Sequence, residues 1–142
     1  MNAPETPSAA LRVVAGAWTR GHRLLAARRR ADRHQGGQWE LPGGKVEAGE
    51  GDRAALAREL LEELGVRVQV QAFVAAHLHP YPARTVHLLA YQVVGVPVDA
   101  EPACHDHAEL RWVTAAEARA LDWAPADRPL LPPVYRLLEP SC

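Results

Sequence analysis

Apolar and polar residues follow patterns along the chain that predict several strands around one central helix. Two short apolar runs, 11–18 and 22–29, are separated by the turn-like "TRGH", which predicts a pair of strands. Further on, "VRVQVQAFVAAHLH" alternates from Val66 to Val70, and "TVHLLAYQVVGV" follows the turn-forming "PYPA". We expect these two runs to form adjacent antiparallel strands, with "ELRWV" as a further short strand.

One stretch in the middle of the chain has the spacing of an amphipathic helix. Leucines recur at three- and four-residue intervals between Asp52 and Leu64, and Gly65 is a natural stop. This spacing predicts a buried face made of Leu56, Ala57, Leu60, Leu61 and Leu64. The acidic residues are expected on the other side of the helix, toward solvent or a cleft.

Two shorter helices are predicted near the end of the sequence. Thr114 and Glu117 have the capping-box spacing that begins a helix, which should end near Leu121. Several prolines precede the apolar "VYRLL", which predicts an ordered loop and a short final helix. The order of these elements indicates an α/β or α+β fold, in which a mixed β-sheet is sandwiched between α-helices.

The chain has the length and composition of one globular domain. It contains 142 residues, of which 48% are apolar and 23% are charged, proportions typical of folded soluble proteins. Residues 1–10 show no strand or helix pattern, so we expect a disordered N-terminal tail before a single domain over residues 11–142. No signal peptide or membrane-length apolar run is apparent, which favours a cytoplasmic protein without a membrane partner.

Charge and cysteine content argue against several other classes. The formal net charge is −1, which argues against tight unspecific binding to a nucleic-acid polymer or to anionic lipid. Cys104 and Cys142 make neither a disulfide framework nor a metal-ligand set. The run "CHDH" suggests a zinc site, but its ligands lie too close together in sequence to reach one ion easily.

The central helix carries its acids at the unfavourable end. Glu59, Glu62 and Glu63 stand at i, i+3 and i+4 in the last turns, where the helix dipole is already negative. Arg58 can pair with Glu62, but one cation leaves the stripe of three carboxylates negative. Because Mg²⁺ prefers oxygen ligands, the stripe predicts a divalent-cation site; a solvated acidic face is the alternative.

A glycine-containing loop, "LPGGKVEAGEG", precedes this helix. Its proline and glycines leave little room for regular structure and allow the backbone to approach a ligand closely. Gly44 therefore suits close contact with phosphates, and Lys45 supplies a point charge for them. Without the helix, Gly-Gly-Lys would indicate only a turn.

The loop and the helix together have a fixed spacing of residue types. From Gly44 the chain reads glycine, five residues, Glu50, seven residues, Arg-Glu-Leu, one residue, Glu-Glu, one residue, Gly-Val. This spacing resembles the complete Nudix box. The resemblance implies a Nudix fold and a hydrolase acting on nucleoside diphosphates linked to another moiety, with Mg²⁺ or Mn²⁺ as the cofactor.

The same resemblance implies roles for individual residues. The implied catalytic residues are Arg58, Glu59, Glu62 and Glu63, and the implied metal ligands are Glu59, Glu62, Glu63 and the backbone carbonyl of Gly43. Glu50 is implied as a supporting residue. Asp106 aligns with a late metal-binding glutamate, for which Glu109 is the alternative.

Beyond the box, the resemblance covers nearly the whole chain and is closest to the MutT-like branch, in particular its CTP pyrophosphohydrolases and 8-oxo-dGTP diphosphatases. The most informative match, "LDWAPADRPLL", lies far from the box. It implies that Asp127 reads the base, unless this residue only caps the final helix, and Arg29 matches a residue near the sugar and phosphates. His79 and Arg84 lie where a base or sugar could rest, although ordinary packing also explains them.

The implied activity is Mg²⁺-dependent hydrolysis of a nucleoside triphosphate to the monophosphate and pyrophosphate, for nucleotide-pool sanitation and DNA repair. An ionised Asp127 only accepts hydrogen bonds, which favours CTP, dCTP or 5-methyl-dCTP, with 8-oxo-dGTP close behind. The alternatives are an ADP-ribose or dinucleoside polyphosphate hydrolase and a non-catalytic nucleotide-binding module. A monomer and a homodimer are both compatible with the sequence.

Overall fold

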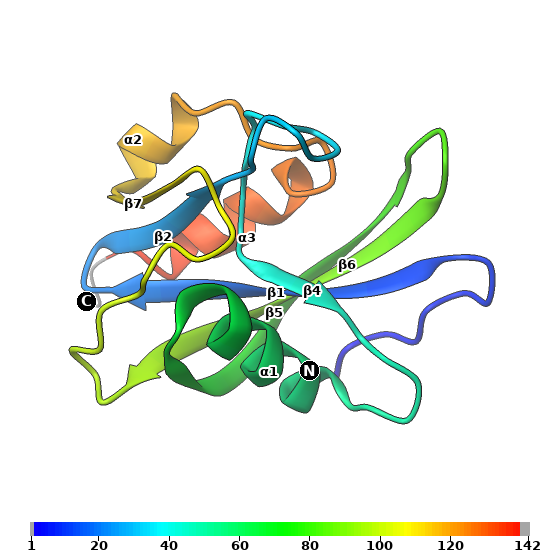
Figure 1. Cartoon of the computed structure of the whole chain (residues 1–142), viewed down its shortest axis with the longest axis horizontal. Coiled ribbons are helices and arrows are strands. Elements are labelled where there is room, and N and C mark those ends of the chain that lie inside the picture. Colours follow the sequence, from blue (N-terminus) through cyan, green and yellow to red (C-terminus); the bar gives the residue numbers. More distant parts are fainter. Residues whose placement is uncertain (1, 140–142) are drawn as a thin grey trace.

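The computed structural model describes residues 2–139, which form one mixed sheet with helices on both faces (Figure 1). The elements in order are β1 (Leu11–Arg20), β2 (Arg23–Arg28), β3 (Trp39–Glu40), β4 (Gly43–Lys45), α1 (Asp52–Leu64), β5 (Arg67–Pro80), β6 (Thr85–Val96), β7 (Glu109–Val113), α2 (Ala115–Arg119), the 3₁₀ turn η1 (Arg128–Leu130) and α3 (Leu131–Arg136). Residue 1 of the expected tail and residues 140–142 of the expected domain lie outside the described residues.

The sheet has the strand order β3-β2-β1-β6-β5, with β4 paired to β1 and β7 paired to β2. β1 and β6 run parallel, whereas β5 and β6 form the antiparallel pair that the sequence predicted. β1 and β2 are also paired as predicted, through Thr19 with Leu24 and Arg20 with Arg23. The loop before α1 differs from its prediction, because Gly43–Lys45 pairs with β1 as a short strand.

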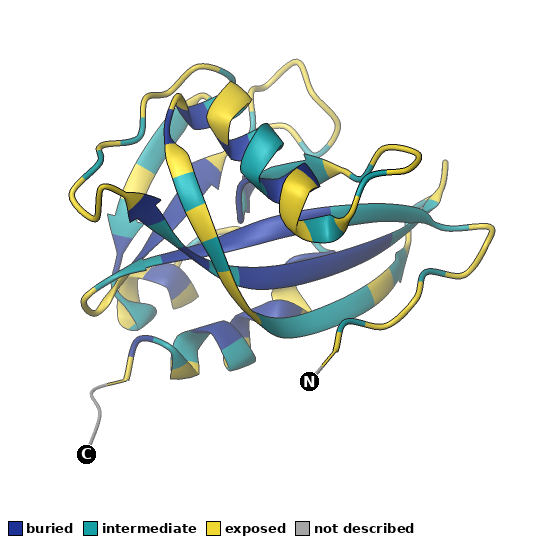
Figure 2. Cartoon of the chain, turned by 90° about the horizontal axis from the view of Figure 1, so that it is seen from below, coloured by how far each residue is buried: buried dark blue, intermediate teal, exposed yellow. Residues whose placement is uncertain are grey.

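Two hydrophobic clusters lie on opposite faces of the sheet, which confirms the predicted sandwich (Figure 2). On one face, Leu56, Leu60 and Leu64 of α1 pack against β1, β2, β5 and β6 residues. On the other face, the cluster includes buried residues from α2, η1 and α3. The prediction for Leu61 is wrong: its side chain is 48% exposed, because the i, i+4 row through Leu60 faces the sheet and the next residue turns away.

The ends of the shorter helices differ slightly from the prediction. The capping box of α2 is present, with Thr114 Oγ1 accepting from the Glu117 N–H and the Glu117 carboxylate accepting from the Thr114 N–H. α2 ends at Arg119, before the predicted Leu121. α3 begins at Leu131, earlier than the apolar run suggested, because prolines fit the first turn of a helix.

The N-terminal segment, expected as a disordered tail, lies against the sheet without forming a helix or strand. Thr6 Oγ1 is 2.7 Å from His87 Nδ1, and Arg12 donates to the Pro4 carbonyl at 2.8 Å. Arg12 also pairs with Asp52 at 2.6 Å, which ties β1 to the first turn of α1. No helix within residues 2–139 is long and apolar enough to cross a membrane.

Candidate active site

The ends of α1 determine where its acids lie. The helix starts after Gly51 and ends at Gly65, whose φ of 67° lies in the left-handed region and whose N–H donates to the Leu61 carbonyl. The last turn contains no basic residue. The acids therefore stand against the helix dipole, as the sequence predicted.

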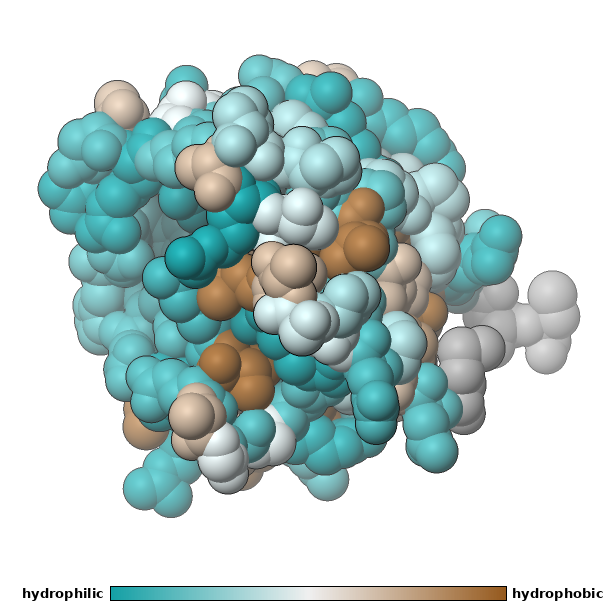
Figure 3. Space-filling model, turned by 90° about the vertical axis from the view of Figure 1, so that its right-hand side faces the viewer, coloured by the Kyte–Doolittle hydropathy of each residue, from teal (hydrophilic) through white to brown (hydrophobic). Residues whose placement is uncertain are grey.

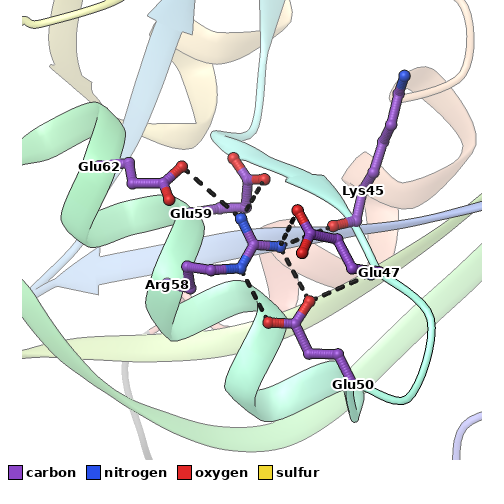
Figure 4. Close-up of polar contacts among 6 residues, drawn as sticks. All are labelled: Lys45, Glu47, Glu50, Arg58, Glu59 and Glu62. Atoms are coloured by element: carbon purple, nitrogen blue, oxygen red, sulfur yellow. Dashed lines mark hydrogen bonds and ion pairs between the residues drawn. The ribbon is translucent and has the colours of Figure 1, made fainter.

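Arg58 is the centre of the acidic surface of α1 (Figure 4). Its guanidinium donates to both oxygens of Glu50 at 2.8 and 2.9 Å and to Glu59 Oε1 at 2.9 Å. Glu62 and Glu47 lie farther away, at 3.6 and 3.8 Å. The hydrogen bonds from Arg58 lower the pKa of Glu50 to about 2, so Glu50 is ionised and holds the guanidinium in place.

The three box glutamates occupy different environments, although their spacing alone predicted one shared face. Glu62 is 61% exposed, whereas Glu59 is mostly buried beside Arg58. Glu63 is buried deeper, and desolvation together with the charges of nearby acids raises its pKa to about 9. Among the described residues, Glu63 Oε2 is buried without a hydrogen-bond partner. A buried carboxylate of this kind is stable in the ionised form only beside a cation.

Two glycines allow β4 to approach both β1 and the acids closely. A Cβ atom at Gly43 would overlap the backbone of Val14, to which β4 is paired. A Cβ at Gly44 would overlap the carboxylate of Glu59. The backbone of β4 therefore lies in close contact with β1 at Gly43 and with the Glu59 carboxylate at Gly44, an approach that the missing Cβ atoms permit.

The residues present fit a divalent cation, although the carboxylates are not gathered around one point. Within residues 2–139, no group of three or more His, Cys, Asp or Glu residues lies close enough together to hold a metal ion. The reason is that Arg58 binds Glu59, while Glu62 extends into solvent. Hard oxygen donors, the unpartnered Glu63 oxygen and the close approach of the Glu59 carboxylate to the Gly44 backbone suit Mg²⁺. The ligand set therefore remains a prediction.

A cavity of about 690 Å³ opens beside β4, a volume typical of small-molecule sites. The predicted site residues that line it are Arg29, Gly43, Gly44, Lys45, Glu63, Arg84, Asp106 and Asp127. The hairpin between β5 and β6 extends toward the side shown in Figure 3, where a few hydrophobic residues gather near the centre of a mostly hydrophilic face. The Lys45 side chain extends away from the acids around Arg58 (Figure 4).

Six predicted residues are not part of the cavity lining. Four of them cluster around Arg58, namely Arg58 itself, Glu50, Glu59 and Glu62, and the other two are bound elsewhere. His79 is not part of its lining; its Nδ1 is 3.2 Å from His77 Nε2, and its ring packs on Tyr81. Glu109 is bound by Arg111 at 2.8 Å on β7. Of the two candidates for the late acidic residue, only Asp106 lines the cavity.

Asp127 is buried in the wall of the cavity, with 5% of its surface exposed. Its Oδ2 accepts a hydrogen bond from the Leu41 N–H at 2.9 Å, and it makes no side-chain cap for the turn that follows. The alternative that it only caps the final helix is therefore wrong. Burial and the charge of Glu40 raise its pKa well above the usual value, which favours the protonated form and alters the hydrogen bonding expected from the sequence.

Sequence reasoning missed Glu40, an acidic residue in this wall. Glu40 accepts from Arg29 Nη1 and pairs with His107 Nε2, both at 2.9 Å, and its charge raises the pKa of both Glu63 and Asp127. Glu40 directly precedes the "LPGG" segment, which is the one sequence signal that could have identified it. Arg29 therefore lies in the cavity as predicted, with Glu40 as its partner.

Comparison with known proteins agrees with this geometry. The NUDIX domain family matches residues 9–134. The chain belongs to the Nudix family. This Nudix hydrolase is 45% identical over 132 residues to a Mycobacterium tuberculosis protein named "Putative 8-oxo-dGTP diphosphatase 2", with 91% of each chain covered. It is 41% identical to the CTP pyrophosphohydrolase of Escherichia coli, over 85% of this chain and 88% of the relative.

Solved structures give the same result for the fold of this Nudix hydrolase. The solution structure of the E. coli ORF135 protein is 40% identical, covers 89% of both chains and superposes with a TM-score of 0.77. The crystal structure of a MutT NUDIX hydrolase from Burkholderia pseudomallei has the same TM-score at 25% identity and covers 87% of this chain and 97% of its own. The relatives and structural neighbours are thus of the MutT-like type that the sequence resembles.

Proposed function

We propose that this Nudix hydrolase is a Mg²⁺-dependent pyrophosphohydrolase that converts a nucleoside triphosphate to the monophosphate and pyrophosphate. The proposed substrates are CTP, dCTP and 5-methyl-dCTP or the oxidised nucleotide 8-oxo-dGTP. The proposed setting is nucleotide-pool sanitation in the cytoplasm, by a monomer or homodimer. Mn²⁺ is expected to support the same reaction when it is supplied in place of Mg²⁺.

One observation carries this proposal: the buried acid of the Nudix box and a buried acid suited to a base line the same cavity. Glu63 and Asp127 both belong to its wall, as does Glu40, whose charge acts on both. A nucleotide that spans this cavity would have its phosphates near α1 and its base near Asp127. The relatives named for 8-oxo-dGTP and for CTP support a nucleotide of this kind.

The side chains at the phosphate end have separate tasks. Glu59, Glu62, Glu63 and the Gly43 carbonyl would hold the metal, which when bound supplies neutralisation of phosphate charge and activation of the attacking water. Arg58 holds Glu59 by its Oε1, which leaves Oε2 for a ligand or a proton. Lys45 lines the cavity and offers a positive charge to the phosphates. An ionised carboxylate of the box accepts the proton of the water.

At the base end, the protonation of Asp127 decides which groups can be recognised. Its Oδ2 already accepts a hydrogen bond from the Leu41 N–H, so only Oδ1 is left to bind the base. A neutral carboxylic acid both donates and accepts, whereas the ionised form only accepts. A mixed donor and acceptor matches the edge of cytosine, with its amine and ring nitrogen, and also the edge of an oxidised guanine.

The decisive experiment measures kcat/KM with Mg²⁺ for CTP, dCTP, 5-methyl-dCTP, 8-oxo-dGTP, dGTP, ADP-ribose and diadenosine polyphosphates, with products identified. We expect the highest values among the first four and release of pyrophosphate. Glu59→Gln should reduce kcat at least about a hundredfold, with an unchanged circular dichroism spectrum. Wild-type turnover in that variant would refute the catalytic role.

Two outcomes would replace the proposal with its alternatives. Preference for ADP-ribose or a dinucleoside polyphosphate would change the substrate class but keep the hydrolase. Nucleotide binding without release of any product would make the chain a non-catalytic module. The base contact is tested by Asp127→Asn, which should change the ratio of kcat/KM for dCTP and 8-oxo-dGTP by about tenfold; an unchanged ratio would remove Asp127 from base recognition.

A further inference from the structure

An ion pair joins two loops at the edge of the cavity. Arg33 lies between β2 and β3, and Asp106 lies between β6 and β7. The Arg33 Nη2 is 2.9 Å from Asp106 Oδ1, and both residues line the cavity. Their side chains are 47% and 40% exposed, so water reaches both.

This contact is easily exchanged. Half-exposed ion pairs contribute little to stability, because water and salt screen them and two flexible side chains must be ordered. Among residues 2–139, Asp106 is the one hydrogen-bond partner of the Arg33 guanidinium. Arg29, by contrast, is held by both Glu40 and the His34 carbonyl. Arg33 can therefore leave Asp106 without breaking another hydrogen bond of its guanidinium within residues 2–139.

The acid that holds Arg33 is one that a metal would also use. Asp106 stands close enough to Glu63 for its charge to act on that carboxyl group. Arg33 thus supplies the positive charge at a place where carboxylates face one another. A divalent cation binding Asp106 would compete with the guanidinium for the negative charge of this carboxylate, since each neutralises it.

The expected position of the substrate's phosphates indicates which group Arg33 binds after it leaves Asp106. A divalent cation in such a site binds the substrate's phosphates together with one or two carboxylates. Phosphates that share a cation with Asp106 would lie within reach of the Arg33 guanidinium, because this group is 2.9 Å from Asp106 before the cation binds. The planar guanidinium presents paired donors that match phosphate oxygens.

We propose that Arg33 is a phosphate-binding residue that Asp106 holds in the metal-free chain and that moves to the substrate's phosphates when the cation takes Asp106. This inference rests on the proposed function, because it needs a phosphorylated substrate and a cation in the same cavity. It makes Arg33 a substrate-binding residue that contacts phosphate irrespective of the base.

The first test measures Mg²⁺ and Mn²⁺ affinity without nucleotide, by calorimetry on the full chain. Arg33→Ala should tighten cation binding about two- to fivefold, because Asp106 is then free. The matched control is Arg23→Ala, which removes an arginine of similar exposure (55%) that pairs with Glu117 outside the cavity and should leave the affinity unchanged. In an Asp106→Asn background, Arg33→Ala should have no further effect.

The second test measures the Kd of an α,β-methylene triphosphate, which resists hydrolysis at that bond, in saturating Mg²⁺. Arg33→Ala should weaken binding about tenfold for cytidine and guanosine analogues alike, whereas Arg33→Lys should recover part of the affinity. Opposite signs in the two tests would support the exchange, since a loss of loop structure would weaken both.

Three results would overturn it: no change in either affinity, weaker binding in both tests, or no binding of the analogue at all. Failure of the proposed function is distinguishable from these. If no nucleotide is hydrolysed but the opposite shifts occur, the role of Arg33 stands and the hydrolase assignment fails. If Glu59→Gln removes turnover while Arg33→Ala changes neither affinity, the role of Arg33 fails alone.

Discussion

Carboxylates gather in two regions of this Nudix hydrolase, on the surface around Arg58 and along the inner wall of the cavity. In the first region, Glu50 is bound by a guanidinium and its pKa falls to about 2. In the second, the pKa of Glu63 rises to about 9 and that of Asp127 rises well above its usual value. Glu50 and Glu63 are the same residue type in one sequence motif, so burial and the available cation determine their charge.

The opposite pKa shifts distinguish an acid that is paired within the protein from acids that lack a counter-ion among the described residues. Glu50 has its counter-ion within the protein and fixes the position of Arg58. Glu63 has an oxygen with no partner and neighbours that repel it. Ionisation of Glu63 is therefore unfavourable in the protein alone, and a cation bound beside it would offset that cost.

The largest effect is expected from Glu63→Gln. Loss of the buried ligand should reduce kcat by about 10²–10⁴-fold, because glutamine carries no charge to bind the metal or accept a proton. In EDTA at pH 8 the same variant should unfold at a higher temperature than the wild type, since the amide avoids the cost of protonating on folding a carboxyl that is ionised in the unfolded chain at that pH. Turnover assays and thermal melts check both; wild-type kcat would contradict the role of Glu63.

A smaller loss is expected from Glu50→Gln, which acts through Arg58. Removing this partner should reduce kcat about ten- to a hundredfold, the usual range for a residue that supports a metal ligand. KM for the nucleotide should change less than kcat, since Glu50 does not line the cavity. Steady-state kinetics of Glu50→Gln and Glu63→Gln, measured under the same conditions, tests which variant loses more kcat. Equal losses would show that both regions act as one.

The pH dependence of stability separates the regions further, and Asp127→Asn exposes it. A carboxyl with a raised folded pKa holds its proton more tightly in the native state, so its contribution to stability is complete below about pH 4 and falls as pH rises toward the folded pKa. Asparagine lacks this loss and can still accept from Leu41. Urea unfolding should show a gain of about 1–2 kcal/mol for the variant at pH 8 and little difference at pH 4. A difference that is constant with pH would contradict the buried, protonated carboxyl.

The smallest effect is expected far from both regions, at the α2 capping box. Thr114→Ala removes the hydroxyl that accepts from the Glu117 N–H and should cost about 1 kcal/mol of unfolding free energy. Turnover at saturating substrate should not change, and the stability loss should be the same at pH 6 and pH 8. Urea titration and the turnover assay check this. A loss of activity would show that α2 affects the catalytic residues, contrary to this prediction.

Local patterns predicted much of the fold. α1 and its stop at Gly65, the Thr114 capping box and the β5–β6 pair are all confirmed, because helix periodicity, capping and strand alternation depend on neighbouring residues. The Nudix box could be found in the same way, since its spacing is continuous in sequence. Leu61 was misplaced because periodicity gives the width of a buried stripe only approximately.

The sequence by itself thus determined the family, the central helix and the acids that it carries. The tertiary structure decided what those acids face: Asp127 against the Leu41 N–H, His107 against Glu40, and Asp106 against Arg33. These partners lie 86, 67 and 73 residues apart in the chain. Burial and charge contact depend on such distant partners, and no local spacing contains them; this is why the two regions of carboxylates differ although their residues look alike in sequence.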